Sequence, residues 1–367
     1  MRSLIDLTKT TQTLLTHYQS SLSPSQATQA SLEISSPQPN PLETIKATTT
    51  LLKSHTTTLS LLLLTPPLTP SAVISKIGDV SSGVLSAMVA AASSTAQQGQ
   101  KDELGESMRT ELRAQVRRVL SGWGEVLALV LRFAERREEE GKKKDDGPTE
   151  AAKQDVLAAT GVVWEACDAL LRTCADGIVG LVVKKAEEYR SVLLDAVEEL
   201  KEWGEDVESE EDEDEGLGSD GEDEDDIFGA ANKLGKGNTE LKVLLDSSVK
   251  KLKMVGILYQ ALIKRRLKTF PKMSTPTNNT NGETSDEPTD PMRVLDKLMV
   301  ILKDIPETVD DLASAFYDLD DNQAKTTLDK TCKKAKSAAG LVRQSWKGQD
   351  DEFTTWSEKW SGMLEGA

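Results

Sequence analysis

Residues 104–133, LGESMRTELRAQVRRVLSGWGEVLALVLRF, carry apolar side chains at intervals of three and four, and this spacing decides the fold class. The members of the repeat run from one end of the stretch to the other: Leu104, Met108, Leu112, Val116, Val119, Trp123, Val126, Val130 and Phe133. Side chains at these intervals lie on one face of an α-helix, which has about 3.6 residues per turn. The stretch therefore predicts a long amphipathic helix with one buried face.

The same periodicity extends outward over almost every stretch of ordinary composition. It is interrupted at proline- and glycine-rich points, at 24, 37–41, 65–71 and 147–148, where a missing N–H and a fixed φ oppose a helix. Asp176-Gly177 is expected to bend or break the helix over 156–200. Towards the end, the pattern predicts one helix over 239–270 and four shorter ones, at 291–304, 306–319, 323–346 and 350–363. No run alternates in the manner of a strand, so the chain is predicted to be all-α.

Charge is distributed unevenly over the 367 residues, whose net charge is −17. Between Glu205 and Asp226 there are 15 acidic residues and no basic one, while the remainder is nearly balanced, with 46 acidic and 44 basic residues. This excludes a generally acidic halophilic surface and a generally basic nucleic-acid binder. We expect an N-terminal helical bundle at 1–204, a disordered acidic linker at 205–237 and a C-terminal bundle at 238–367, with a second disordered loop at 271–290.

No pattern in the chain indicates catalysis. Phosphate loops, nucleophile elbows and paired metal ligands are missing from the sequence, so we expect neither an enzyme nor a cofactor nor a metal site. The few cysteines and histidines are interpreted as core and surface residues respectively: Cys167, Cys174, Cys332, His17 and His55. The start of the chain lacks an apolar signal segment, and its most apolar run, 59–64, is short. A soluble intracellular protein is expected.

Three interpretations of the acidic segment stay open. The first is a solvated linker, the second is a docking element for basic partners such as histone tails, and the third is a target of phosphorylation. Ser209 and Ser219 each have an acidic residue three positions later, which suits an acid-directed kinase of the casein kinase type. A phosphate would add a charge of about −1.5 to −2.

The helix expected at 239–270 carries the opposite charge, with eight basic and two acidic residues. It is a candidate to hold the acidic segment in cis, as an autoinhibitory contact. Within it, Lys264, Arg265, Arg266 and Lys268 resemble a short nuclear import signal. The alternative is a helix C-terminus whose cations favour the helix dipole.

Aromatic side chains form a stripe on the last helix: Phe353, Trp356 and Trp360, continued by Met363. Large buried side chains contribute about 1.5–3 kcal/mol each, so core packing is the first explanation. An exposed face for docking a partner protein is the second.

Residues 160–170, TGVVWEACDAL, preceded by Trp123-Gly124, resemble the helical core of the cyclin-D-binding protein family, also called cyclin-D-interacting proteins or human homologue of Maid. The resemblance is to a fungal-like member and is best over 45–205. It implies a fold related to the five-helix bundles of talin and I/LWEQ proteins. It also implies a non-enzymatic protein of nucleus and cytoplasm, which binds cyclins or helix-loop-helix regulators, as a possible homo- or heterodimer, and restrains the cell cycle.

These observations favour a helical regulatory scaffold that binds other proteins through helix faces, without direct contact with nucleic acid or membrane. Two alternatives come from other classes of protein. One is an acidic chaperone for histones or other basic proteins, which would depend on residues 205–226. The other is a talin-like cytoskeletal module, which would depend on the C-terminal bundle.

Overall fold

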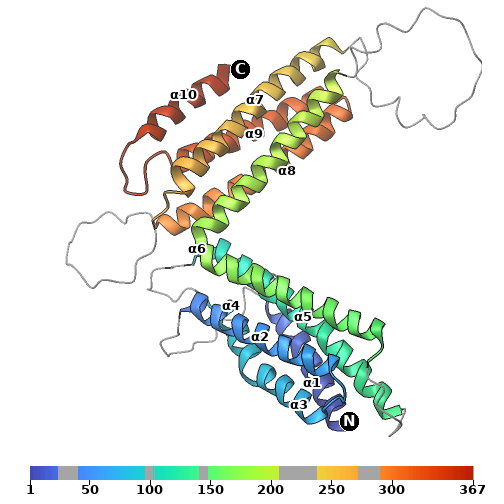
Figure 1. Ribbon diagram of the computed structural model, residues 1–367. Helices are drawn as coiled ribbons and strands as arrows, with labels where there is room; N and C mark the ends of the chain where they lie inside the picture. Colours follow the sequence, from blue (N-terminus) through green and yellow to red (C-terminus); the bar gives the residue numbers. More distant parts are fainter. Residues whose placement is uncertain are drawn as a thin grey trace, which may run out of the picture. The chain divides into compact units, whose positions relative to one another are not determined.

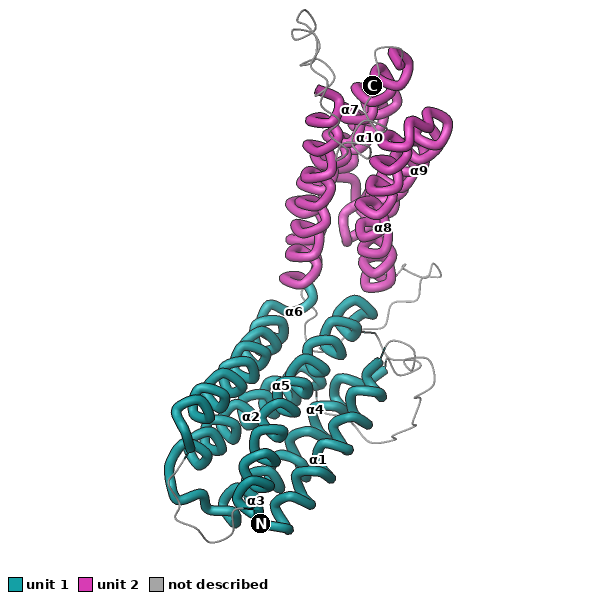
Figure 2. The backbone as a smooth tube through the Cα atoms, turned by 90° about the vertical axis from the view of Figure 1, so that its right-hand side faces the viewer, with its two compact units in different colours: residues 1–178 teal, residues 179–367 magenta. Residues whose placement is uncertain are grey.

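The computed structural model describes residues 1–23, 40–95, 102, 104–139, 148–205, 238–271 and 290–366. Every regular element in these ranges is a helix, and none of the described residues lies in a β-strand (Figure 1). The prediction of an all-α protein is confirmed. The chain folds as two compact units, residues 1–178 and 179–367 (Figure 2). The predicted linker and the predicted loop lie almost wholly outside the described ranges.

Unit 1 is a bundle of five helical rods among its described residues. They are α1 (Arg2–Ser21), α2 (Pro41–Leu64), the continuous rod α3–η2–α4 (Pro70–Asp79, Val80–Val84 and Leu85–Ala92), α5 (Gly105–Glu139) and the first half of α6 (Glu150–Glu205). Local signals set the helix starts. At α2, for example, the Asn40 side chain accepts a hydrogen bond from the Leu42 N–H at 2.9 Å, and Pro41 occupies the first turn.

The rod α3–η2–α4 contains one π-helical turn, at Val80–Val84. By length and composition alone, Pro70–Ala92 is apolar enough to cross a membrane. In unit 1, however, its periodic side chains are fully buried against the other helices: Val73, Ile77, Val80, Leu85 and Met88. The rod packs on α1, α2 and α5, so these side chains belong to the core of the bundle.

The long helix α6 is broken at Gly177, where φ is 62° and ψ is −164°. This backbone conformation is essentially confined to glycine, because any Cβ would clash. The break predicted at Asp176-Gly177 is thus confirmed. The boundary between the two units falls next to it, after Ile178. The N-terminal bundle was predicted to extend to residue 204, whereas the second half of α6 packs within unit 2.

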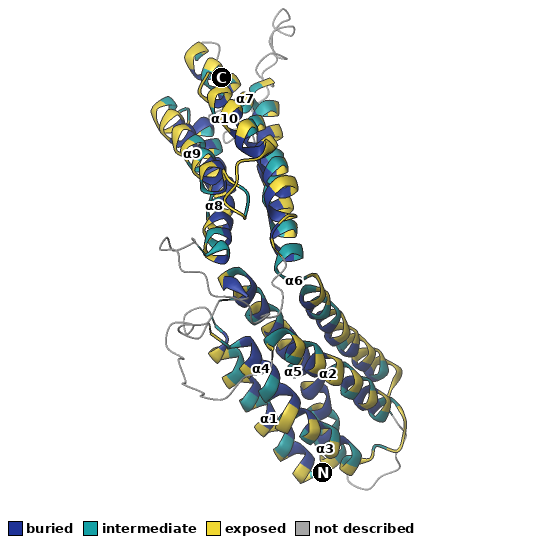
Figure 3. Cartoon of the chain, turned by 90° about the vertical axis from the view of Figure 1, so that its left-hand side faces the viewer, coloured by how far each residue is buried: buried dark blue, intermediate teal, exposed yellow. Residues whose placement is uncertain are grey.

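Unit 2 contains the second half of α6 and four further helical rods among its described residues. They are α7 with its π-helical end η6 (Thr239–Leu262 and Ile263–Leu267), α8 (Pro291–Tyr317), α9 (Asp321–Leu341) and α10 (Glu352–Gly366). In both units the buried residues face the inside of the bundle, and the exposed residues face outward (Figure 3).

Pro306 does not separate two helices, as the sequence predicted, but lies inside the single helix α8. A proline has no N–H, so the carbonyl four residues earlier, that of Leu302, loses its normal helical partner. In unit 2 the buried hydroxyl of Tyr259 donates to this carbonyl at an O–O distance of 2.5 Å. The carbonyl is satisfied from α7, and α8 continues through the proline.

Candidate protein-binding surface

On unit 1, the first half of α6 presents two large apolar side chains to solvent. Leu157 is 57% exposed and Trp164 is 38% exposed. They are seven residues, or two helical turns, apart and lie on one side of the helix, with Gly161 between them. A Cβ at Gly161 would meet nothing within 4 Å. The three residues form an apolar stripe with an open notch at its centre, which we call the α6 stripe.

Glycine at this point costs helix stability, roughly 1 kcal/mol relative to alanine. Packing inside the unit does not require it. Gly122 on α5 shows the contrast, because a Cβ there would lie 3.3 Å from the Val163 Cγ2 atom. Gly122 is needed for the contact between α5 and α6, whereas Gly161 opens onto the surface. The position therefore leaves open space on the outer face of α6.

Charged side chains on both borders of the α6 stripe are paired within unit 1. On the α2 side, Lys53 Nζ lies 2.5 Å from Asp168 Oδ1. On the α5 side, Arg118 Nη2 lies 3.2 Å from Glu165 Oε1. Exposed pairs of this kind add little stability, but each places opposite charges together beside the stripe. The surface therefore offers apolar contact between neutralised borders, which suits a protein helix more than an ion or a charged metabolite.

The three predicted docking residues on α10 have different environments. Phe353 and Trp360 are buried in unit 2, and the Trp360 indole donates to the Met254 carbonyl at 2.9 Å. These two side chains fix α10 to α7, as the core-packing explanation expected, and their burial takes them out of a docking face. Trp356 is half-buried and lines a groove of about 390 Å³ with the exposed Ile257. It alone remains a candidate for docking.

Among the four residues of the predicted nuclear import signal, Arg266 is only 1% exposed. Lys264 is exposed, Arg265 pairs with Glu352, and Lys268 Nζ lies 3.9 Å from Glu187 Oε1. The run of cations suggested a solvent-facing segment, but the helix turns its third member inward. The prediction needs this correction, because a buried guanidinium cannot be read by an import receptor.

Arg266 is the centre of a structural clamp. Its Nη1 and Nη2 atoms lie 2.7 and 2.8 Å from the two carboxylate oxygens of Asp351, a bidentate pair. Its Nε donates to the Val342 carbonyl at 2.7 Å, and its guanidinium carbon lies 4.3 Å from the centre of the Phe353 ring. Hydrogen bonds from Arg266 hold the pKa of Asp351 down at about 2. The clamp ties α7 to the segment between α9 and α10, where α9 ends earlier than predicted.

Catalytic chemistry has no support among the described residues. No group of His, Cys, Asp and Glu there could hold a metal ion. Burial raises the pKa of the Cys167 thiol to about 12 and that of Cys174 to about 11, so both stay protonated and unreactive. Ser209 and Ser219 lie outside the described residues, as does the rest of the acidic segment beyond Glu205. Phosphorylation there stays a prediction.

The α6 stripe was not identified as a site from the sequence, although Gly161 and Trp164 were among the residues quoted for the family resemblance. The available signal was Gly161 within an otherwise regular helical pattern. A glycine there is equally consistent with tight packing or with open surface, and only the neighbouring helices distinguish the two.

Residues 44–206 match the family model described as "Grap2 and cyclin-D-interacting, N-terminal". This part of the chain is therefore similar to the N-terminal region of cyclin-D-interacting proteins. The match runs from the first turn of α2 to the end of α6 and contains the whole α6 stripe. The resemblance noted at residues 160–170 is confirmed, and the family's description names interaction with a protein partner.

An uncharacterized protein of Schizosaccharomyces pombe (strain 972) is similar along most of its length. It is 26% identical over 321 residues, which cover 88% of this chain and 83% of the yeast protein. The similarity therefore extends beyond residue 206, where the cyclin-D-interacting match ends, and further into unit 2. It includes residues on both sides of the acidic segment.

Proposed function

We propose that this chain is a non-enzymatic helical regulator that binds cyclin-type proteins and thereby restrains cell-cycle progression. The observation that carries the proposal is the α6 stripe, which is apolar, exposed, and located inside the region that matches the cyclin-D-interacting family. We place the protein in the cytoplasm and the nucleus, where cyclin-type partners act.

An amphipathic helix of the partner is the occupant that fits the stripe best. Leu157 and Trp164 are separated by about 10 Å along α6, which matches anchors two turns apart on a second helix. Helices pack at axial distances of about 8–10 Å, and the notch at Gly161 admits a side chain of the partner at the crossing point. The neutralised borders remove any requirement for a strongly charged partner helix.

Binding of the full chain to a purified D-type cyclin, measured by isothermal titration calorimetry, tests the proposal. Trp164→Ala should weaken binding by about 30-fold, because truncating an aromatic anchor at the centre of an interface costs about 2 kcal/mol. Leu51→Ala is the matched control. Leu51 is also an exposed apolar residue, but it is two residues from Lys53, which faces α6, so it points away from the stripe. Its loss should change affinity less than threefold. Equal effects of both variants, or no effect of either, would contradict the proposal.

Gly161→Gln separates binding from folding. Glutamine favours a helix over glycine, so this variant should unfold at a higher denaturant concentration, with a gain of about 0.5 kcal/mol. Its side chain occupies the notch, so binding to the cyclin should fall at least tenfold. Unchanged binding by this more stable variant would show that the notch is not part of the interface.

A further inference from the structure

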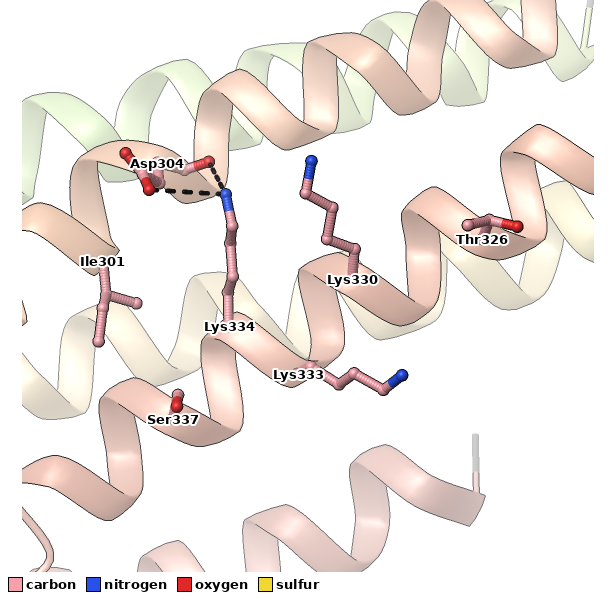
Figure 4. Close-up of a pocket in the computed structure, with 7 residues that line it drawn as sticks. All are labelled: Ile301, Asp304, Thr326, Lys330, Lys333, Lys334 and Ser337. Atoms are coloured by element: carbon pink, nitrogen blue, oxygen red, sulfur yellow. Dashed lines mark hydrogen bonds and ion pairs between the residues drawn. The ribbon is translucent and has the colours of Figure 1, made fainter.

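A groove of about 550 Å³ lies between α8 and α9 on unit 2, and three lysines of α9 line it (Figure 4). Besides Lys330, Lys333 and Lys334, the lining contains one acidic side chain, that of Asp304 on α8. The formal charge of the lining is therefore clearly positive. Ile301 adds an apolar side chain on the α8 wall.

The three lysines differ in how they are held. Lys334 is fixed, because its Nζ donates to the Thr308 hydroxyl at 2.8 Å and lies 3.7 Å from an Asp304 carboxylate oxygen. Lys330 and Lys333 have no ion-pair partner among the described residues, and both are exposed. In Figure 4 the Lys330 amino group lies on the α8 side of the groove, as does that of Lys334. Lys330 is thus available to an anionic ligand beside Lys334, and Lys333, which points away from α8 in Figure 4, adds a cation at the outer edge of the groove.

The acidic segment starts close to one end of this groove. The last described residues before it belong to α6, where Trp203 packs on Tyr317 at the end of α8, with ring centroids 5.5 Å apart. The described chain resumes at Asn238, and Gly204 near the end of α6 lies against Leu245 in the second turn of α7. Thr326 in the groove is five residues into α9, about 8 Å from its start. Ten extended residues span about 33 Å, so residues 206–226 are long enough to lie along the groove while both ends stay attached.

The negative charge of residues 206–226 complements the positive charge of the groove, so we take this segment as the ligand of the groove. Residues 206–226 contain 14 acidic side chains and no basic one. In the helix first considered as their partner, 239–270, Arg265, Arg266 and Lys268 are paired with Glu352, Asp351 and Glu187. The exposed Lys250 and Lys253 of that helix serve as the comparison in the test below. We propose that residues 206–226 bind in cis to the lysine groove between α8 and α9.

The test uses a chain that lacks residues 206–226 and a fluorescent peptide of the same sequence, with binding followed by anisotropy. The shortened chain should bind the peptide, and raising NaCl from about 50 to about 500 mM should weaken binding strongly, since screening acts on exposed charges. The intact chain should bind the peptide at least tenfold more weakly, because its groove is occupied. Equal binding by both chains would overturn occupancy in cis and leave the groove to an acidic partner.

Charge reversal locates the site. In the shortened chain, Lys330→Glu/Lys333→Glu should weaken peptide binding at least tenfold. The matched control is Lys250→Glu/Lys253→Glu on α7, which makes the same change in net charge and should change affinity less than threefold. Neither pair of lysines has an ion-pair partner among the residues described, so circular dichroism should show all variants folded. Equal weakening by both double variants would mean diffuse attraction and would overturn the proposed site.

Discussion

Tyr259→Phe is expected to destabilise unit 2 by about 2 kcal/mol, although it removes only one oxygen atom. The Tyr259 hydroxyl donates to the Leu302 carbonyl at 2.5 Å, and both residues are fully buried. Pro306 supplies no N–H to that carbonyl. Without the hydroxyl, the carbonyl is left in the core with no partner, which costs about 1–3 kcal/mol. Burial also raises the pKa of Tyr259, so the phenol remains a donor at all physiological pH values.

The assay is urea unfolding of the full chain, followed by circular dichroism and tryptophan fluorescence. Each unit can give its own transition, so the data are fitted with two. With a slope of about 2 kcal/mol per molar urea, the unit 2 midpoint should fall by about 1 M. Tyr317→Phe is the matched control. Tyr317 is half-buried and no hydrogen bond of its hydroxyl is observed within the described part of the chain, so the shift should be below about 0.5 kcal/mol.

A second substitution isolates the cause. In a Pro306→Ala background, the N–H of the introduced alanine can donate to the Leu302 carbonyl, so Tyr259→Phe should then cost only about 0.5–1 kcal/mol. The double-mutant cycle should give a coupling of about 1 kcal/mol or more between positions 259 and 306. If Tyr259→Phe costs the same with proline and with alanine at 306, the hydroxyl does not replace the missing N–H and the reasoning fails.

The clamp, the break in α6 and the basic run each lead to a further prediction. Asp351 has a pKa lowered to about 2, so its stabilisation is complete above its unfolded pKa of about 4 and is lost as pH falls towards 2. Allowing for its 36% exposure, Asp351→Asn should remove about 1 kcal/mol at pH 7 and flatten this acid dependence in urea unfolding; an unchanged acid profile would exclude the clamp. Gly177→Ala should destabilise the chain by about 1–3 kcal/mol, because its φ is 62°; stabilisation, as expected for glycine to alanine in a continuous helix, would refute the break. Lys264→Ala/Lys268→Ala should leave the nuclear fraction of a fluorescent fusion unchanged, since Arg266 is buried; loss of nuclear signal would show that the segment is read after all.

Local signals were sufficient for the helices and for the break at Gly177. Apolar side chains at intervals of three and four predict each helix that buries one face in the core. Asp-Gly marks a point where the backbone can leave the helical region. The all-α class and the positions of most helices follow from such signals. They involve residues within a few positions of one another, so a single sequence contains them.

Pro306 and Arg266 show which features a linear pattern does not contain. Proline ends a helix unless something else satisfies the freed carbonyl, and the donor here is Tyr259, 43 residues from that carbonyl. A run of cationic side chains is expected on the surface unless a carboxylate pairs with one of them in the interior. Here that carboxylate belongs to Asp351, which is 85 residues from Arg266 in the sequence. The α6 stripe belongs to the same class, because its exposure depends on where α2 and α5 pack.

The second half of α6 makes the limits of the family match a poor guide for dividing the protein. Leu193 and Leu200 are fully buried, and Trp203 contacts Phe316 of α8, yet α8 lies beyond residue 206. A fragment of residues 44–206 would carry this apolar face with nothing to cover it and would also lack α1. Recombinant material cut at those limits should aggregate through the bare helix. A fragment that ends at residue 178 keeps the core of unit 1 together with the α6 stripe, and is the better starting material for crystallising this unit.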